Sequence, residues 1–185
     1  MPGSTPVYGL PYLELDDPPD IAGATQDLAE AVETRLQAAA ATPQPAAHYQ
    51  GANDTSGAQT YLAGTDNGVT FTAPSSGKVY VSISASLGTN AVIGGAGAWL
   101  SFEVRLGSSI GSGTVVLAAD DSRAAGPQRP NNPTSGTKYV PASARILVSS
   151  LTPGSTYNAR TMFRSDTTGA TTAVLNRYIL VEPVL

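Results

Sequence analysis

The sequence predicts a mainly β protein: a jelly-roll-like antiparallel β-sandwich preceded by an extended N-terminal arm and one short α-helix. Beyond residue 46, short runs of alternating apolar and polar residues are separated by turn clusters such as Ser75-Ser76-Gly77 and Thr152-Pro153-Gly154. Charged residues make up only 13% of the chain, and small and β-branched residues are abundant, which favours a β-shell over a helical enzyme. We divide the chain into an arm (1–20), a helix (21–41), a linker (42–46) and a sandwich (47–185).

The arm at 1–20 contains five prolines, which restrict it to extended geometry. It is nevertheless more apolar than a solvated tail, and exposed apolar runs usually find a partner. We expect it to anchor the chain to another protein, and the alternative is a terminus that packs on its own helix. The expected anchoring residues are Tyr8, Leu10, Pro11, Tyr12, Leu13 and Leu15.

The helix expected at 21–41 begins after Asp20, a favourable N-cap, and ends before the prolines of the linker. Its apolar residues follow a short heptad-like spacing, which predicts association with other copies of the same helix. The alternative is that the helix packs across the β-domain of its own chain. The expected trimerisation residues are Ile21, Leu28, Val32 and Leu36.

Seven alternating runs predict strands at 69–72, 78–87, 99–106, 114–118, 145–150, 157–164 and 173–181. Their number and spacing are typical of a Greek-key sandwich. Asp66-Asn67-Gly68 is interpreted as a turn. In the run 99–106, Leu100, Phe102, Val104 and Leu106 form the expected core face, opposite Trp99, Ser101, Glu103 and Arg105. The core is expected to include Val81, Ile83, Phe102, Val104 and Ile146.

Residues 120–141 are too many for a hairpin turn and contain four prolines, so we expect a long surface loop. Its arginines suit anionic polymers and its asparagines suit sugar hydroxyls. A loop that only caps a neighbouring subunit is the alternative. The expected host-contact residues are Arg123, Arg129, Asn131 and Asn132.

The sequence offers little catalytic chemistry. Cysteine is absent, which excludes disulfides and thiolate metal sites, and His48 is the only histidine. No nucleophile motif accompanies a serine, so His48 is interpreted as a residue at the domain neck. Asp120-Asp121 is a calcium candidate together with Asp54 or Asp66, but adjacent loop aspartates are usually turn formers. We therefore expect no enzymatic activity, no cofactor and no metal.

The net charge of −4 is unevenly distributed: residues 1–40 hold seven acidic residues and one basic, and residues 41–185 hold seven acidic and nine basic. Neither part has the charge pattern of a nucleic-acid-binding protein. No apolar run reaches the length of a membrane span, and the N-terminus does not have the pattern of a signal peptide. We expect a soluble protein made in a cytoplasm.

Six short stretches of the sequence resemble known protein families. Tyr8-Gly9-Leu10-Pro11-Tyr12, with the Asp16–Asp20 stretch and Leu28–Glu33, is similar to the start of many minor tail and fibre proteins of tailed bacteriophages that infect actinobacteria. The stretch Phe71–Val81 resembles the entry of trimeric jelly rolls of the complement C1q and tumour-necrosis-factor type. The turn Leu151–Tyr157 and the closing run Arg177–Pro183 fit the same pattern.

The resemblance implies a homotrimeric virion structural protein of the minor tail or fibre type, held by its arm and assembled in the host cytoplasm. Three weak contacts on one trimer would bind a host surface by avidity. No long shaft separates arm and head, so a capsid decoration protein is the alternative. A different class, a carbohydrate-binding module or glycan hydrolase, would use Trp99 or loop tyrosines to stack on sugar. An aromatic residue beside paired carboxylates in a groove would favour that class.

Overall fold

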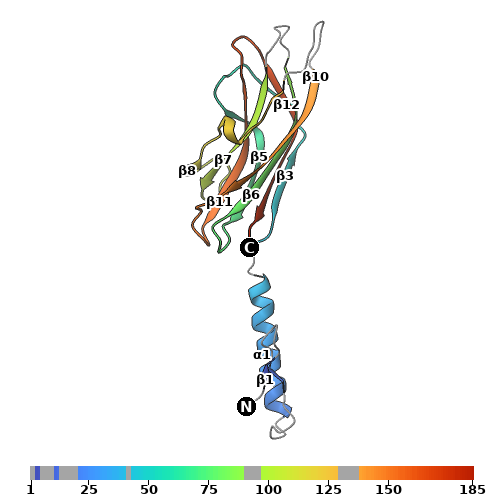
Figure 1. Cartoon of the computed structure of the whole chain (residues 1–185), viewed down its shortest axis with the longest axis vertical. Helices are drawn as coiled ribbons and strands as arrows, with labels where there is room; N and C mark the ends of the chain where they lie inside the picture. Colours follow the sequence, from blue (N-terminus) through green and yellow to red (C-terminus); the bar gives the residue numbers. More distant parts are fainter. Residues whose placement is uncertain (1–2, 5–10, 13–20, 41–42, 90–96, 129–137) are drawn as a thin grey trace. The chain divides into compact units, whose positions relative to one another are not determined.

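A computed structural model of the chain describes residues 3–4, 11–12, 21–40, 43–89, 97–128 and 138–185 (Figure 1). The chain divides into two compact units, Met1–Thr42 and Pro43–Leu185, and the division falls at the start of the expected linker. None of the helices in the described ranges is both long and apolar enough to cross a membrane.

The first unit holds the helix α1 (Ile21–Ala40) and two short strands, β1 (Gly3–Ser4) and β2 (Pro11–Tyr12). The two strands pair antiparallel, and β2 lies beside α1. The four described residues of the arm therefore have extended strand backbone, and they pair with one another. This agrees with the extended geometry that the prolines of the arm favour. Tyr8, Leu10, Leu13 and Leu15 lie outside the described residues.

The apolar stripe of α1 is exposed in the single chain. The exposed fractions are 41% for Leu28, 39% for Val32 and 65% for Leu36. The side chain of Ile21 lies outside the described part of the helix. Within the first unit, no described residue buries this stripe.

The second unit is an antiparallel β-sandwich, which confirms the predicted fold class. The strands are β3 (Ala46–Gln50), β4 (Asp54–Ser56), β5 (Leu62–Thr72), β6 (Val79–Thr89), β7 (Ala98–Leu106), β8 (Val115–Leu117), β9 (Ala125–Gln128), β10 (Lys138–Val148), β11 (Thr156–Ser165) and β12 (Thr172–Pro183). One sheet has the order β10-β6-β12-β3, with β4 also on β12, and the other has the order β5-β11-β7-β8, with β9 also on β7. From β4 to β7, and again from β9 to β12, successive strands alternate between the two sheets, as in a jelly roll, whereas β7, β8 and β9 all belong to one sheet.

The core lies between the two sheets. Val81 and Ile83 of β6 and Phe102 and Val104 of β7 are at most 1% exposed, as the alternation predicted. Ile146 packs against this cluster and is partly buried. The prediction that Leu106 faces the core is wrong. Its side chain is 45% exposed because it ends β7 at the rim of the sandwich.

Two further predictions differ from the structure, and two strands were not predicted. Asp66-Asn67-Gly68 is not a turn, because β5 continues through it and its pairing with β11 is irregular there. The range 120–141 is not one loop: it contains the 3₁₀ helix η1 (Asp121–Arg123), β9 and the start of β10. The edge strands β3 and β4 were not expected from the sequence, and β3 pairs with the last strand, β12.

A buried ion pair connects β12 to β4. The Arg177 side chain is fully buried and forms an ion pair with the carboxylate of Asp54, whose side chain is 19% exposed. The backbone N–H and hydroxyl of Thr65 also donate to this carboxylate, at 2.7 and 2.8 Å. A methyl group at Gly64 would overlap both partners, so the close approach of β5 requires glycine.

Candidate functional site

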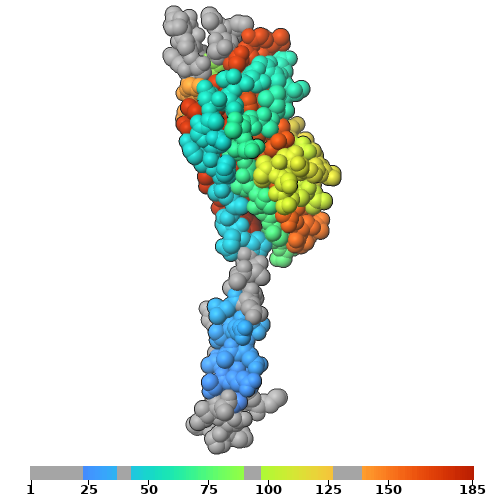
Figure 2. Space-filling view, turned by 180° about the vertical axis from the view of Figure 1, so that it is seen from behind, coloured from blue at the N-terminus to red at the C-terminus, as the bar shows by residue number. Residues whose placement is uncertain are grey.

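A polar groove of about 640 Å³ lies on the outer face of the β5-β11-β7-β8 sheet. Outward-facing residues of β7 and β11 stand opposite one another in register, with Glu103 beside Arg160 and Trp99 beside Arg164. The segment from β8 to η1 runs along one side of them. Residues 107–118 form the yellow protrusion on the β-domain in Figure 2. The lining residues are Gln59, Thr60, Tyr61, Glu103, Ala118, Ala119, Asp120, Asp121, Met162 and Arg164.

The short helix η1 is fixed to the sheet by backbone and side-chain hydrogen bonds. Asp120 is its N-cap and accepts from the N–H and hydroxyl of Ser122, at 2.9 and 2.6 Å. The Ser101 hydroxyl of β7 donates to the Asp120 carbonyl at 3.0 Å, and Arg123 Nη2 donates to the Ala118 carbonyl at 2.8 Å. One wall of the groove is therefore built into the sheet rather than being a free loop.

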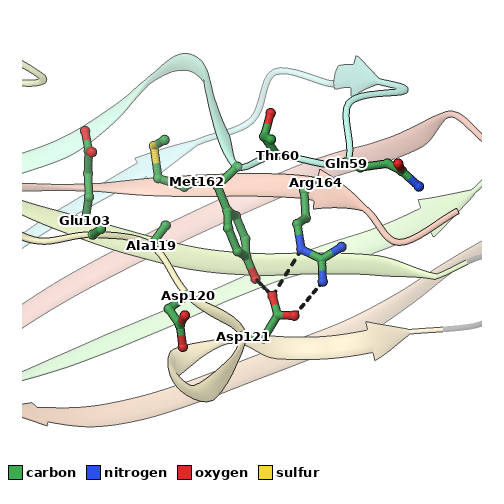
Figure 3. A pocket seen from close by; sticks show the side chains of 10 residues that line it. Gln59, Thr60, Glu103, Ala119, Asp120, Asp121, Met162 and Arg164 are labelled. Carbon is green, nitrogen blue, oxygen red and sulfur yellow. Dashed lines mark hydrogen bonds and ion pairs between the residues drawn. The ribbon is translucent and has the colours of Figure 1, made fainter. Parts of the chain in front are cut away.

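Arg164 is held at one end of the groove, where Figure 3 shows it facing Asp121. Its Nε and Nη2 donate to the two carboxylate oxygens of Asp121, at 3.0 and 2.6 Å. The Tyr61 hydroxyl donates to the same carboxylate at 2.9 Å. The guanidinium carbon lies 5.4 Å from the Tyr61 ring centroid and 5.1 Å from that of Trp99. Bidentate pairing and two aromatic rings leave this arginine little freedom.

Glu103 occupies the other end of the groove, next to Met162 in Figure 3. Arg105 donates to both carboxylate oxygens, at 2.8 and 3.1 Å, and Arg160 donates to one of them at 2.5 Å. The carboxylate is nearly buried and still carries a charge, because two guanidinium groups compensate it.

These contacts keep the three carboxyl groups of the groove ionised. Burial would raise the pKa of Glu103, but the hydrogen bonds from Arg105 and Arg160 outweigh it and the pKa is lowered. The hydrogen bond from Arg164 lowers the pKa of Asp121, and those from Ser122 lower the pKa of Asp120. Burial and the hydrogen bond to Asp121 raise the pKa of the Tyr61 phenol. At neutral pH the groove therefore presents three carboxylates and one neutral phenol.

Other candidate residues from the sequence contact protein groups rather than an open site. Trp99 is half-buried, and Arg164 packs over its ring. Arg123 supports the wall of the groove, and Arg129, Asn131 and Asn132 lie outside the described residues. His48 Nδ1 lies 3.0 Å from Oδ1 of Asn67, an amide, not a serine.

The calcium candidates are separated and engaged by other partners. Asp54 pairs with Arg177 and Asp121 pairs with Arg164, while Asp120 caps η1. Within the described residues, no group of three or more acidic, histidine or cysteine side chains is placed to hold a metal ion.

The sequence singled out Trp99 and Asp120-Asp121 but not Tyr61 or Arg164. Tyr61 and Asp121 are 60 residues apart, and Arg164 and Asp121 are 43 apart, so only the strand order brings them together. One signal was available: one face of β11 carries the polar residues Asn158, Arg160 and Arg164, which indicates that this face has polar partners.

No family model matches the chain, and no curated protein does. Among solved structures, the chain is similar to one from infectious bursal disease virus, Gx strain, with 16% identity and a TM-score of 0.31. That match covers 77% of this chain and 38% of the virus chain. It is also similar to the CBM22-1 xylan-binding domain of Paenibacillus barcinonensis Xyn10C, with 15% identity, a TM-score of 0.28, and coverage of 75% and 87%. Both similarities are remote, and the fold described above follows from the strand pairing itself.

Proposed function

We propose that this chain is a non-enzymatic, homotrimeric structural protein of a tailed-phage virion, with the N-terminal arm as its anchor. The β-sandwich is displayed outward for host contact or particle stabilisation. The observation that carries the proposal is the exposed apolar stripe of α1. The virion assignment draws on the resemblance of the N-terminal motifs to phage tail and fibre proteins. A position on the capsid, as a decoration or head fibre protein, is the variant of the same proposal.

The stripe on α1 supports self-association. In proteins, most of the stability of a helix such as the 20-residue α1 comes from packing of its apolar face against a partner. Leu28, Val32 and Leu36 are spaced four residues apart and lie on one side of the helix, and all three are exposed. Further copies of α1 present the same stripe, so they are the simplest partner that covers it.

The outer face of the β10-β6-β12-β3 sheet supports the same conclusion. It exposes aromatic and aliphatic side chains: Tyr49, Tyr80, Tyr139, Leu147 and Tyr178. Serines of β6 and β10 form the floor of a shallow hollow of about 340 Å³ beside Tyr178. Arg145 and Glu182, on the same face, neutralise each other at 3.1 Å. Exposed tyrosine and little net charge are the composition of an interface core.

Light scattering on the purified protein should give the mass of about three chains per oligomer, because association would bury the apolar stripe of α1. Changing Leu28 and Val32 to serine should shift the mass to that of one chain. The control is Asp27→Ser, a substitution at a polar exposed position next to the stripe. A monomer in the unmodified protein, or a serine variant that stays trimeric, contradicts the role of α1.

Removing residues 1–20 should leave the β-sandwich folded, since Pro43–Leu185 is a compact unit by itself. The same truncation should abolish incorporation into phage particles, because the arm is the proposed anchor. Circular dichroism checks the fold, and immunogold micrographs of purified particles check incorporation. Label on tails or on heads separates the tail position from the capsid position. Normal labelling with the truncated chain would show that the arm does not anchor the protein.

A further inference from the structure

The groove on the β5-β11-β7-β8 sheet is a built site whose lining can bind a ligand without rearranging. Its volume of about 640 Å³ lies within the range of small-molecule sites. Asp121 fixes both Tyr61 and Arg164, and two arginines fix Glu103. Groups held in this way lose little conformational entropy when a ligand binds.

The lining is polar, and the charge of its three carboxylates is balanced by Arg164 and by arginines that lie beside the groove. Each groove carboxylate has a cationic neighbour: Glu103 has Arg105 and Arg160, Asp121 has Arg164, and Asp120 has Arg123. A small anion would meet three carboxylates, and a metal cation would meet carboxylates already engaged by arginine. A neutral ligand rich in hydroxyl groups fits this set better, because hydroxyls both donate to carboxylates and accept from guanidinium groups.

The groove is also lined by polar side chains without hydrogen-bond partners and by apolar side chains. Gln59 and Thr60 lie at the rim with exposed side chains, and within the described part of the chain these side chains have no hydrogen-bond partner. An amide and a hydroxyl each offer both a donor and an acceptor. The half-buried ring of Tyr61 supplies apolar surface for the C–H faces of a sugar, and Met162, which is 8% exposed, also lines the groove. We propose that this groove binds a neutral oligosaccharide, with Gln59 and Thr60 as direct hydrogen-bonding residues.

The electrostatics favour binding without hydrolysis. A glycosidase with two carboxyl groups needs one of them protonated at working pH to act as the general acid. In this groove the pKa values of Glu103, Asp120 and Asp121 are all lowered. Each carboxylate can therefore accept hydrogen bonds from sugar hydroxyls, and none is protonated at neutral pH to act as the general acid.

The proposal concerns the β-sandwich of one chain and does not depend on the trimer. On an assembled particle, several such grooves would add their affinities through avidity. Light scattering measures assembly separately, so a failure of sugar binding is distinguishable from a failure of the proposed virion role.

The test uses the full chain and the fluorescence of Trp99, the only tryptophan. Arg164, which lines the groove, stacks on Trp99, so a bound ligand should change its emission. The probes are linear neutral hexasaccharides of glucose, galactose, mannose, xylose and arabinose, with polygalacturonate and polyglycerol phosphate as anionic comparisons. Isothermal titration calorimetry gives the affinity of each probe.

We expect at least one neutral hexasaccharide to bind, and the double variant Gln59→Ala, Thr60→Ala to bind it at least about tenfold more weakly. The matched control, Thr152→Ala, removes an exposed hydroxyl outside the groove and should bind like the unmodified chain. Thermal melts check that both variants fold. The proposal is overturned if no neutral probe binds, if only an anionic polymer binds, or if the double variant keeps full affinity.

Discussion

Replacing Asp54 with alanine is expected to lower the free energy of unfolding by about 3 kcal/mol. The change leaves the guanidinium of Arg177 fully buried without its charge partner. Apart from this ion pair, the three guanidinium nitrogens have no hydrogen-bond partner among the described residues, so nothing else there compensates the charge. The estimate is at the lower end for broken buried pairs because the Asp54 side chain is 19% exposed. Urea unfolding followed by circular dichroism measures the loss.

The double variant Asp54→Ala, Arg177→Met is the control, because it removes the buried charge as well as its partner. It should be more stable than Asp54→Ala alone. If the two variants unfold at the same urea concentration, the charge of Arg177 is not the cause of the loss.

The stabilisation by Asp54 should also depend on pH. Burial would raise the pKa of Asp54, but hydrogen bonds from Thr65 and the charge of Arg177 outweigh it and lower the pKa below 3.8. A lowered pKa in the folded state means that the contribution is fully present above pH 3.8 and is lost as pH falls through the folded-state pKa. The stability difference between the unmodified chain and Asp54→Ala should therefore shrink only in strong acid.

Truncating Phe102 to alanine is expected to cost about 3–5 kcal/mol, the usual range for emptying a buried aromatic site. Phe102 is fully buried in β7 between the two sheets, and such a loss is a large part of a typical domain's stability. The control is Leu106→Ala in the same strand, at a side chain that is 45% exposed. We expect it to cost less than about 1 kcal/mol. Equal losses in denaturant melts would contradict the assignment of the two positions.

The sequence was sufficient to predict the strands that have one buried and one solvated face. The alternating residues of β6 and β7 predicted both the strands and the side chains that enter the core. It was insufficient for β3 and β4, because Ala46–Gln50 and Asp54–Ser56 have no apolar alternation and gain their pairing from β12. Asp66-Asn67-Gly68 has turn chemistry, but Asn67 is buried and its amide donates to Thr161 at 3.0 Å. Tertiary contacts therefore overrode a local signal.

The groove was less predictable than the core, since a core position needs only burial whereas a site needs specific neighbours. Asp120 was interpreted as a turn former and does cap η1. The pairing of Arg164 with Tyr61 and Asp121 depends on the order of strands within a sheet and on the path of the β8–η1 segment. No local pattern in the sequence specifies either of them.

The pairing of β3 with β12 affects how the protein is made. These strands open and close the β-domain in the sequence, so the sheet that contains them cannot be completed before residues 172–183 have left the ribosome. Strand pairing over such separations is slow, on the order of milliseconds to seconds. The helix at 21–40, in contrast, emerges early. In the trimer proposed above, neighbouring nascent chains on a polysome would therefore meet through α1 while their β-domains are still unfolded, and this association would precede completion of the sandwich.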